Sequence, residues 1–273
     1  MRNCDLHTHT NHSDGVHTPT ELVEKAKEVG LEVIAITDHN VVSGNEEAIK
    51  AGERLGVEVI SGCEIACEEG EVLAYFIDYK NPILHEFLTR IDEAKYGMRT
   101  GIIEKLNQAG MEISLEEIKN KYPVFNSSNI AREMIEKGYA KNFRDAFDTY
   151  IGQGRPCYCE FEGVTALDVV KMIKRVGGLA VLAHPWIVGL KRFQKQMDQL
   201  IEAGLDGIEC ANFAKNDLHG ESIEWAKQVS DKYGLVLTSG SDYHGPHHPD
   251  NMIGDYNCDG SVVDALKTRL SDL

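Results

Sequence analysis

Hydrophobic and polar positions alternate with two different periods along the first third of the chain. Apolar residues recur at helical spacing between positions 22 and 29, and a continuous apolar run follows at 31–37. A second helical pattern, at 43–55, leads to another apolar run at 57–61. Continuous apolar runs between amphipathic helices are typical of buried parallel strands. With a first strand that ends near His9, the pattern predicts the strand–helix alternation of an α/β fold.

The alternation stops between residues 81 and 153. One more apolar strand is predicted at 71–79, but within the interrupted region only helical patterns can be read, among dense charged and polar residues. Apolar strand runs resume at 179–183, 207–210 and 235–239. We therefore predict a catalytic barrel built from residues 1–80 and 154–273, and a helical insertion of residues 81–153 that covers the active site.

Composition narrows the class of protein. No apolar run approaches the ~20 residues of a membrane span, and the N-terminus lacks the pattern of a signal peptide. The seven cysteines lack CxxC spacing, and Cys4, Cys63 and Cys210 lie in or beside apolar strand runs, where a free thiol behaves as a small hydrophobe. We expect a cytoplasmic protein with reduced thiols and no membrane association.

The formal net charge of −16 also limits the partners. An extended nucleic-acid footprint requires a basic face, which this composition does not favour. A small phosphorylated ligand remains compatible with the charge, because bound divalent cations reverse the local field. The oligomeric state cannot be read from the sequence.

Side chains that can bind metals stand at the predicted strand ends. His7 and His9 are two residues apart, so an extended strand directs both imidazoles to the same face. Asp14 follows on a turn that Gly15 closes. Later strand ends carry His39, Glu64, His184, Asp242 and His244. Because the C-terminal strand ends of barrels and open α/β sheets form active sites, we expect these eight side chains to converge.

Convergence of eight such groups is best explained by metal ions. Without cations they would repel one another and resist desolvation, although a set of unrelated polar strand ends is the alternative reading. Mixed nitrogen and oxygen ligation suits zinc, manganese or iron. Adjacent ions can generate hydroxide at neutral pH and hold phosphoryl oxygens. Glu209, at another strand end, either orients a ligand imidazole or is simply polar.

Six short motifs resemble those of the PHP (polymerase and histidinol phosphatase) family, and they follow the family's order over nearly the whole chain. They are Asp5–His9, Ser13–Gly15, Ile36–His39, Ser61–Glu64, Ala183–Pro185 and Gly240–His244. The resemblance implies a distorted (β/α)7 barrel, TIM-like, with up to three metals and hydrolysis of phosphate esters. The helical insertion resembles the subgroup of nucleoside 3′,5′-bisphosphate phosphatases and 5′-acting exoribonucleases.

The resemblance also divides the ligands among ions of manganese, iron or zinc. One ion would be held by His7, His9, Glu64 and Asp242. A second would be held by Asp14, His39 and His244. A third would share Glu64 and use His184. The subgroup has a histidine in the strand after the Glu64 motif, where this chain reads Glu-Val-Leu and Leu73 takes the histidine's place. We therefore expect two tightly held ions, a weak or empty third pocket, and His184 as a candidate general acid.

Substrate contacts are expected from the insertion and its surroundings. The subgroup carries an Arg-x-His-x-Ala-Arg pattern, and here Ser127 and Asn129 replace the first arginine and the histidine, whereas Arg132 matches. Arg155 is a second candidate for phosphate, because a guanidinium binds it in bidentate fashion; either arginine could instead be a surface residue. The candidate substrate-binding residues are Arg132, Arg155, Asn129 and His219.

These observations predict attack of a metal-bound hydroxide on the phosphorus of a small phosphorylated metabolite, a nucleotide bisphosphate or a sugar phosphate. Three enzymatic alternatives keep the same site: a 5′–3′ exoribonuclease acting on short RNA, a cyclic phosphate phosphodiesterase, and an amidohydrolase-type reaction. A non-catalytic metal-binding module is disfavoured by the nearly complete ligand set.

Overall fold

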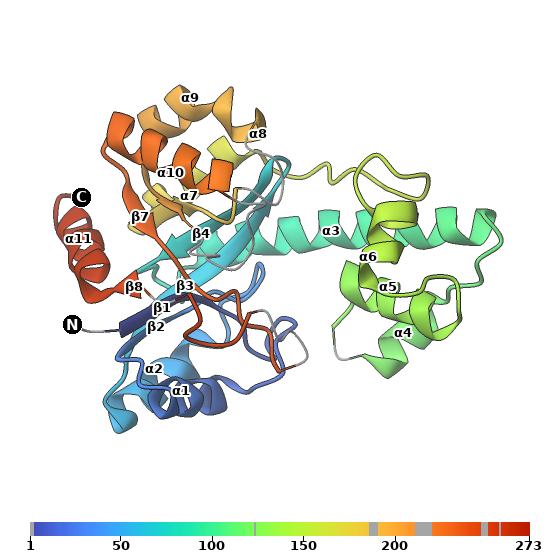
Figure 1. Cartoon of the computed structure of the whole chain (residues 1–273), viewed down its shortest axis with the longest axis horizontal. Helices are drawn as coiled ribbons and strands as arrows, with labels where there is room; N and C mark the ends of the chain where they lie inside the picture. Colours follow the sequence, from blue (N-terminus) through green and yellow to red (C-terminus); the bar gives the residue numbers. More distant parts are fainter. Residues whose placement is uncertain (1–2, 123, 186–190, 211–219, 247–250, 257) are drawn as a thin grey trace. The chain divides into compact units, whose positions relative to one another are not determined.

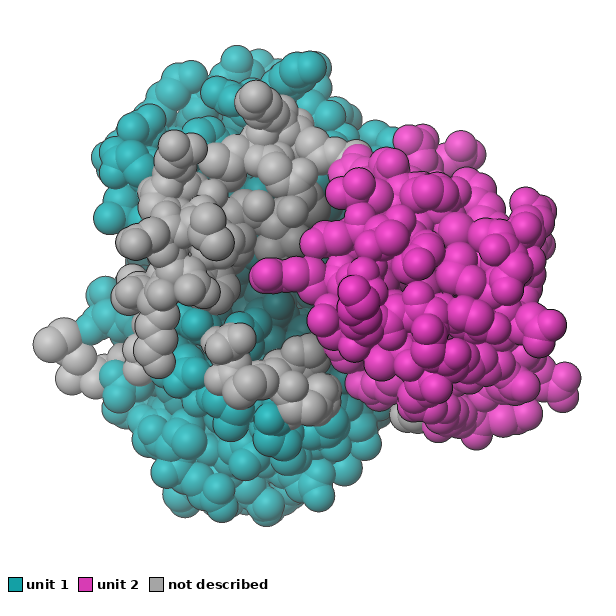
Figure 2. All heavy atoms as spheres, turned by 45° about the vertical axis from the view of Figure 1, so that its right-hand side comes forward, with its two compact units in different colours: residues 1–88, 164–273 teal, residues 89–163 magenta. Residues whose placement is uncertain are grey.

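The chain forms two compact units. The computed structural model describes residues 3–122, 124–185, 191–210, 220–246, 251–256 and 258–273. One unit comprises residues 1–88 and 164–273, and the other comprises residues 89–163 (Figure 2). The predicted boundaries, after residue 80 and before residue 154, fall eight and ten residues earlier in the chain. The expectation that the insertion covers the active site stays a prediction.

The larger unit is built on a single sheet that curls into a nearly closed barrel (Figure 1). The strands of its described residues are β1 (Asn3–Thr8), β2 (Val33–Ile36), β3 (Glu58–Cys67), β4 (Gly70–Tyr75), β5 (Leu179–Leu182), β6 (Leu205–Glu209), β7 (Val236–Thr238) and β8 (Cys258–Asp259). Their order in the sheet is β7-β6-β5-β4-β3-β2-β1-β8. Most neighbours are parallel, but β4 is antiparallel to both β3 and β5, and β8 is antiparallel to β1. The predicted α/β barrel-like architecture is confirmed, and the described residues form eight strands, where the resemblance implied seven.

Helices follow the strands in the order that the hydrophobic pattern predicts. In the larger unit they are α1 (Pro19–Glu28), α2 (Asn45–Leu55), α7 (Ala166–Arg175), α8 (Lys191–Gln194), α9 (Met197–Glu202), α10 (Gly220–Tyr233) and α11 (Gly260–Ser271). Thr18 and Glu21 form a capping box at the start of α1, and Thr165 and Asp168 form another at α7. These reciprocal bonds satisfy amide groups that a helix start leaves without partners.

The smaller unit is helical. It contains most of α3 (Pro82–Gln108), which begins in the larger unit, and then α4 (Leu115–Lys121), α5 (Ser127–Glu136), α6 (Phe143–Ala146) and the π-helix η1 (Phe147–Ile151). Its own core includes Leu106, Ile118, Ile130 and Met134, all of which are buried. In the described part of the chain no helix is long and apolar enough to cross a membrane.

The barrel interior is filled by apolar side chains. Leu6, Leu73, Tyr75 and Val181 belong to one buried cluster, and the Tyr75 hydroxyl donates to the carbonyl oxygen of Leu6 at 2.8 Å. Side chains on a strand alternate between faces, so Leu73 and Tyr75 share the inward face of β4. Above this layer lies the edge where the parallel strands end, which we call the rim.

The barrel closes where the chain after β7 meets β1. The Leu6 amide donates to the carbonyl oxygen of Ser239 at 3.3 Å, and the Asp242 amide donates to that of His7 at 2.9 Å. These bonds place residues 239–243 beside the strand that carries His7. Closure therefore brings the last predicted ligands next to the first.

Cys4 was expected to be a free thiol, but it forms a disulfide with Cys258 across the β1–β8 pair. The Cα–Cα distance of this disulfide is 5.1 Å. Cys63 and Cys210 are free, as predicted. The two bonded cysteines are 254 residues apart in the chain. Their pairing depends on the antiparallel strand β8, which no hydrophobic run signalled.

We predict that Gly240→Ala destabilises the barrel closure. A Cβ at this position would lie too close to the backbone nitrogen and Cβ of His7. Overpacking of this kind lowers the free energy of unfolding by about 1–3 kcal/mol. Thermal unfolding monitored by circular dichroism measures the change. Gly97→Ala is the control, because an added Cβ there meets open space; equal midpoints for the two variants would contradict the prediction.

Candidate metal centre

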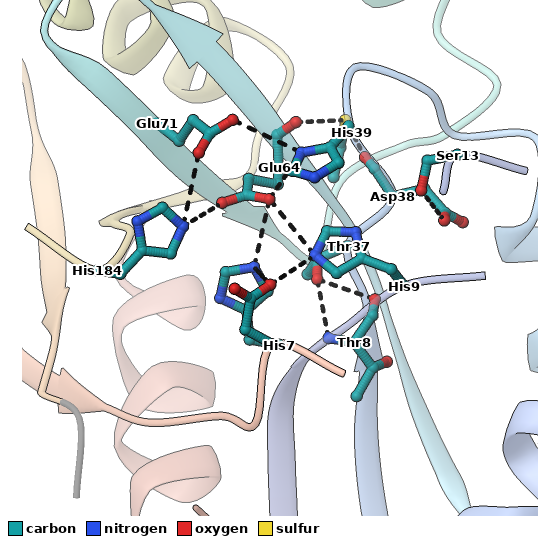
Figure 3. A network of polar contacts seen from close by, with 12 residues as sticks. His7, Thr8, His9, Ser13, Thr37, Asp38, His39, Glu64, Glu71 and His184 are labelled. Atoms are coloured by element: carbon teal, nitrogen blue, oxygen red, sulfur yellow. Dashed lines mark hydrogen bonds and ion pairs between the residues drawn. The ribbon is translucent and has the colours of Figure 1, made fainter. Parts of the chain in front are cut away.

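Four side chains form the first cluster on the rim: His7, His9, Glu64 and Asp242. His9 Nε2 lies 3.0 Å from Asp242 Oδ1 and 3.4 Å from Glu64 Oε2, and His7 Nε2 lies 3.3 Å from Glu64 Oε2. His7, His9 and Glu64 are fully buried, and Figure 3 shows both imidazoles close to the Glu64 carboxylate. The structure thus brings together the four side chains assigned to one ion.

The second cluster consists of His9, Asp14, His39 and His244. His244 Nε2 lies 3.2 Å from Asp14 Oδ1 and 3.5 Å from His39 Nε2. His9 is common to both clusters, and its ring stacks at 4.1 Å on that of His244. Because they share this residue, the two clusters are adjacent. The three side chains assigned to a second ion therefore lie together, with His9 beside them.

A third cluster contains a residue that the sequence reasoning missed. His39, Glu64 and Glu71 place ligand atoms within 4.8 Å of one another. His184 lies beside them, with its Nε2 2.8 Å from Glu64 Oε1 and 3.6 Å from Glu71 Oε2 (Figure 3). The expectation that only Glu64 and His184 meet in this pocket is therefore wrong.

The error lies in the direction of β4. Leu73 pairs with Glu64 in the sheet register, and its side chain is buried in the barrel core rather than at the rim. Because β4 is antiparallel to its neighbours, its first residues, not its last, reach the rim. The sequence did contain a sign of this ligand. Glu71, Leu73 and Tyr75 share the inward face of β4, and Glu71 is the charged residue among the three.

The donor set fits divalent cations. His7 Nε2 and Glu64 Oε2 are buried, and neither has a hydrogen-bond partner of normal geometry among the described residues. Buried polar atoms without such partners are costly, and a cation between them would satisfy both. Imidazole and carboxylate together are the ligands that zinc, manganese and iron accept. Bound cations would therefore satisfy these buried side chains better than contacts among the side chains do.

Charges within the rim shift the imidazole pKa values in opposite directions. Burial disfavours the charged form of His39, but Glu64 and Asp14 outweigh burial and raise its pKa to about 10. Burial, with the neighbouring His244 and His39, lowers the pKa of His9 to about 4. Burial also opposes the charged form of His184, yet its bond to Glu64 raises the pKa to about 9. Metal binding requires neutral imidazoles, so a cation would take the place of the protons on His39 and His184.

A buried carboxylate holds the turn that carries Asp14. Asp38 accepts hydrogen bonds from the amide and hydroxyl of Thr10, both at 2.7 Å. It also accepts a hydrogen bond from the hydroxyl of Ser13 at 2.6 Å (Figure 3). These three hydrogen bonds hold Thr10 and Ser13, and so the turn between them, against the Asp38 side chain. Asp38 therefore positions the second cluster without belonging to it.

Glu209 connects two of the clusters. Its Oε1 accepts from His7 Nδ1 at 3.1 Å, in the tautomer that leaves Nε2 for the first cluster, and its Oε2 accepts from the backbone amide of His184 at 2.8 Å. The backbone of His184 has a positive φ of 20°, which is uncommon for a residue with a side chain. Of the two readings for Glu209, the structure favours orientation of a ligand imidazole.

Three of the four candidate substrate residues, Asn129, Arg132 and Arg155, lie in the smaller unit. The Asn129 side chain donates to the carbonyl oxygen of Val124 at 2.8 Å, so this amide is used at the start of α5. Arg132 lies over the rings of Tyr122 and Phe143, at 5.5 and 5.9 Å from their centroids. Arg155 is exposed on the turn after η1. Their contacts with substrate stay predictions, and His219 lies outside the described residues.

Comparison with known proteins adds independent information. The family model described as PHP domain matches residues 5–151. The chain is 29% identical over 272 residues to a 3′,5′-nucleoside bisphosphate phosphatase of Chromobacterium violaceum, covering 93% of this chain and 91% of the relative. It is 31% identical over 250 residues to a 5′-3′ exoribonuclease of Haemophilus influenzae, covering 89% and 90%. A phosphoribosyl 1,2-cyclic phosphate 1,2-diphosphodiesterase of Eggerthella lenta is 30% identical over 251 residues, covering 88% and 94%.

Solved structures agree over nearly the whole length. A Bifidobacterium adolescentis protein assigned as a metal-dependent phosphoesterase superposes with a TM-score of 0.85 at 27% identity, covering 98% of this chain and 96% of the other. A Chromobacterium violaceum protein described as an amidohydrolase, with bound SO4 and no metal, superposes with a TM-score of 0.81 at 29% identity, covering 94% and 91%. The barrel and the helical insertion therefore recur together in known structures.

We predict that Glu209→Gln weakens metal binding at the rim. Both carboxylate oxygens of Glu209 accept hydrogen bonds, whereas glutamine offers one oxygen and turns its NH2 group toward a donor. Changes of this kind beside ligands lower metal affinity about 10–100-fold. Competition with a chromophoric chelator measures the affinity. Glu32→Gln, which alters an exposed carboxylate, is the control; unchanged affinity in Glu209→Gln would refute the orienting role.

Proposed function

The chain belongs to the PHP domain family of metal-dependent phosphoesterases, and we propose that it hydrolyses a phosphate ester of a small phosphorylated metabolite, a nucleoside bisphosphate or a sugar phosphate. The observation that carries this proposal is the adjacency of the first two clusters, which share His9. Adjacent cation sites are suited to reactions in which negative charge develops on neighbouring oxygens.

The proposed roles of the rim residues follow from the clusters. His7, His9, Glu64 and Asp242 would hold one ion, and Asp14, His39 and His244 a second. Manganese, iron and zinc all suit these donors. When bound, such ions supply positive charge to phosphoryl oxygens and activate water at neutral pH. The chain itself supplies the fixed geometry, through Asp38 at the Asp14 turn and Glu209 behind His7.

His184 is better suited to ligation than to proton transfer. The general-acid hypothesis assumed an imidazole that is partly free, but His184 Nε2 faces both Glu64 and Glu71. Its side chain is 6% exposed, which leaves little access for a leaving group. We therefore assign His184 to the set of metal-binding residues.

The substrate is proposed to be small because of the charge of the chain. The net charge of −16 provides no extended track for a polynucleotide. The similar bisphosphate phosphatase and the similar exoribonuclease are both matched over about nine-tenths of their length, so the charge and not the match favours the small substrate. The SO4 bound in a related structure is also a tetrahedral dianion with the shape of phosphate. Arg132 and Arg155 remain the proposed phosphate contacts, since guanidinium groups bind phosphate in bidentate fashion.

We predict faster turnover of a nucleoside 3′,5′-bisphosphate than of an RNA of about 20 nucleotides, because binding of long RNA relies on basic contacts along its backbone. Phosphate release and RNA shortening, measured at two salt concentrations, test this. A strong preference for the RNA that falls steeply with salt would favour the exoribonuclease alternative. Preference for a 1,2-cyclic phosphate in the same panel would favour the phosphodiesterase alternative.

We also predict that activity requires bound divalent metal. Treatment with a strong chelator should abolish turnover, and added Mn²⁺ should restore it in the wild type. The double variant His7→Ala with His9→Ala should stay inactive at any Mn²⁺ concentration, because it removes two ligands of the first cluster. His85→Ala, which alters an exposed histidine, serves as the control. Full turnover by the metal-free protein would rule out the proposed reaction class.

A further inference from the structure

Asp5 is a fully buried carboxylate on β1 that belongs to none of the three clusters. Its side chain accepts hydrogen bonds from three backbone amides. Oδ1 accepts from His7 at 3.3 Å and from Ser241 at 2.9 Å, and Oδ2 accepts from Gly254 at 3.0 Å. A carboxylate removed from water is costly, and hydrogen bonds to both of its oxygens offset that cost. The backbone of the barrel therefore uses both oxygens of Asp5.

These bonds connect segments that are distant in the sequence. One donor is on β1 itself, whereas Ser241 and Gly254 lie after the end of β7. The residues between these two donors include Asp242 and His244, which belong to the first and the second cluster respectively. Asp5 thus holds both ends of a ligand-bearing segment against β1.

The first cluster depends on these bonds more directly than the second cluster does. Ser241 immediately precedes Asp242, and its amide shares one carboxylate oxygen with the amide of His7. The Asp242 amide also donates to the carbonyl oxygen of His7 at 2.9 Å, so these two ligands are held together. His244 has a separate contact, because its carbonyl oxygen accepts from the amide of Val16 at 3.1 Å. Loss of the carboxylate should therefore displace His7 and Asp242 more than His244.

We propose that Asp5 is a positioning residue for the cation of the first cluster, and that it acts through His7 and Asp242. Its oxygens face backbone amides rather than the cluster, so its effect on the ion is indirect. The inference rests on the proposed function only in that the first cluster binds a divalent metal.

Two variants remove the acceptor oxygens in steps. Asp5→Asn keeps the shape of the side chain but replaces one acceptor oxygen with an NH2 group, so at least one of the three bonds is lost. Asp5→Ala removes all three. Anomalous scattering from crystals soaked at graded Mn²⁺ concentrations gives the occupancy of each metal position separately. The Mn²⁺ concentration that half fills the first position should rise about tenfold or more in Asp5→Ala and less in Asp5→Asn, whereas the second position should change less than about threefold.

Two controls separate the position of the ligands from the stability of the fold. Gly52→Ala forces a Cβ against Val57 and Val59 at the start of β3, the end opposite Glu64, so it should lower stability and leave both metal positions unchanged. Asp38→Asn alters the carboxylate that holds the turn before the second cluster. It should weaken the second position and spare the first.

Four results would each overturn the proposal: an empty first position in the wild type, an unchanged first position in Asp5→Ala, equal losses at both positions, or a matching loss in Gly52→Ala. Circular dichroism of the metal-free variants shows whether they fold. Should Asp5→Ala not fold, Asp5→Asn carries the same comparison, and its first position should again lose more than its second. Because occupancy is measured without substrate, missing phosphatase activity would refute the proposed function and leave this result intact.

Discussion

The rim depends on one buried carboxylate, that of Glu64. It is fully buried, and four imidazoles surround it: those of His7, His9, His39 and His184. An ionised carboxylate removed from water is costly unless positive charge lies against it. Protons on the imidazoles can supply part of that charge, as the raised pKa values of His39 and His184 indicate. Cations can supply it while leaving the imidazoles neutral, which is the form in which histidine binds metal.

The fold brings these groups together through its topology. Parallel strands deliver their last residues to one edge, and the antiparallel β4 delivers its first. The backbone at His184 and Asp242 adopts positive φ angles of 20° and 53°, so local geometry is set by the site rather than by backbone preference. Hydrogen bonds to Glu209 and from the Asp242 amide to His7 hold these two residues. The strain is thus offset by contacts with the first strand and with β6.

Sequence patterns identified much of this arrangement because most of the donors follow parallel strands. Apolar runs marked those strands, and the residue after each run was a sound candidate for the rim. At β4 the resemblance to the family's motif placed Leu73 at the rim, whereas the antiparallel strand brings Glu71 there. An apolar run does not reveal the direction of its strand, so the pattern could not correct this assignment. It also failed at Cys4, whose partner lies on a two-residue strand. The Asn129 side-chain amide donates to the carbonyl oxygen of Val124, which precedes α5, and this bond depends on a loop conformation that periodicity does not encode.

The central claim is that the first two clusters hold adjacent cations that act together on a phosphate group. The most direct measurement is a crystal structure of protein loaded with Mn²⁺ and inorganic phosphate, with the metal located by anomalous scattering. The account predicts one peak bounded by His7, His9, Glu64 and Asp242 and a second bounded by Asp14, His39 and His244, about 4 Å apart or less, with phosphate oxygens on both. Metal peaks away from the rim, or phosphate bound with no metal near these residues, would contradict it.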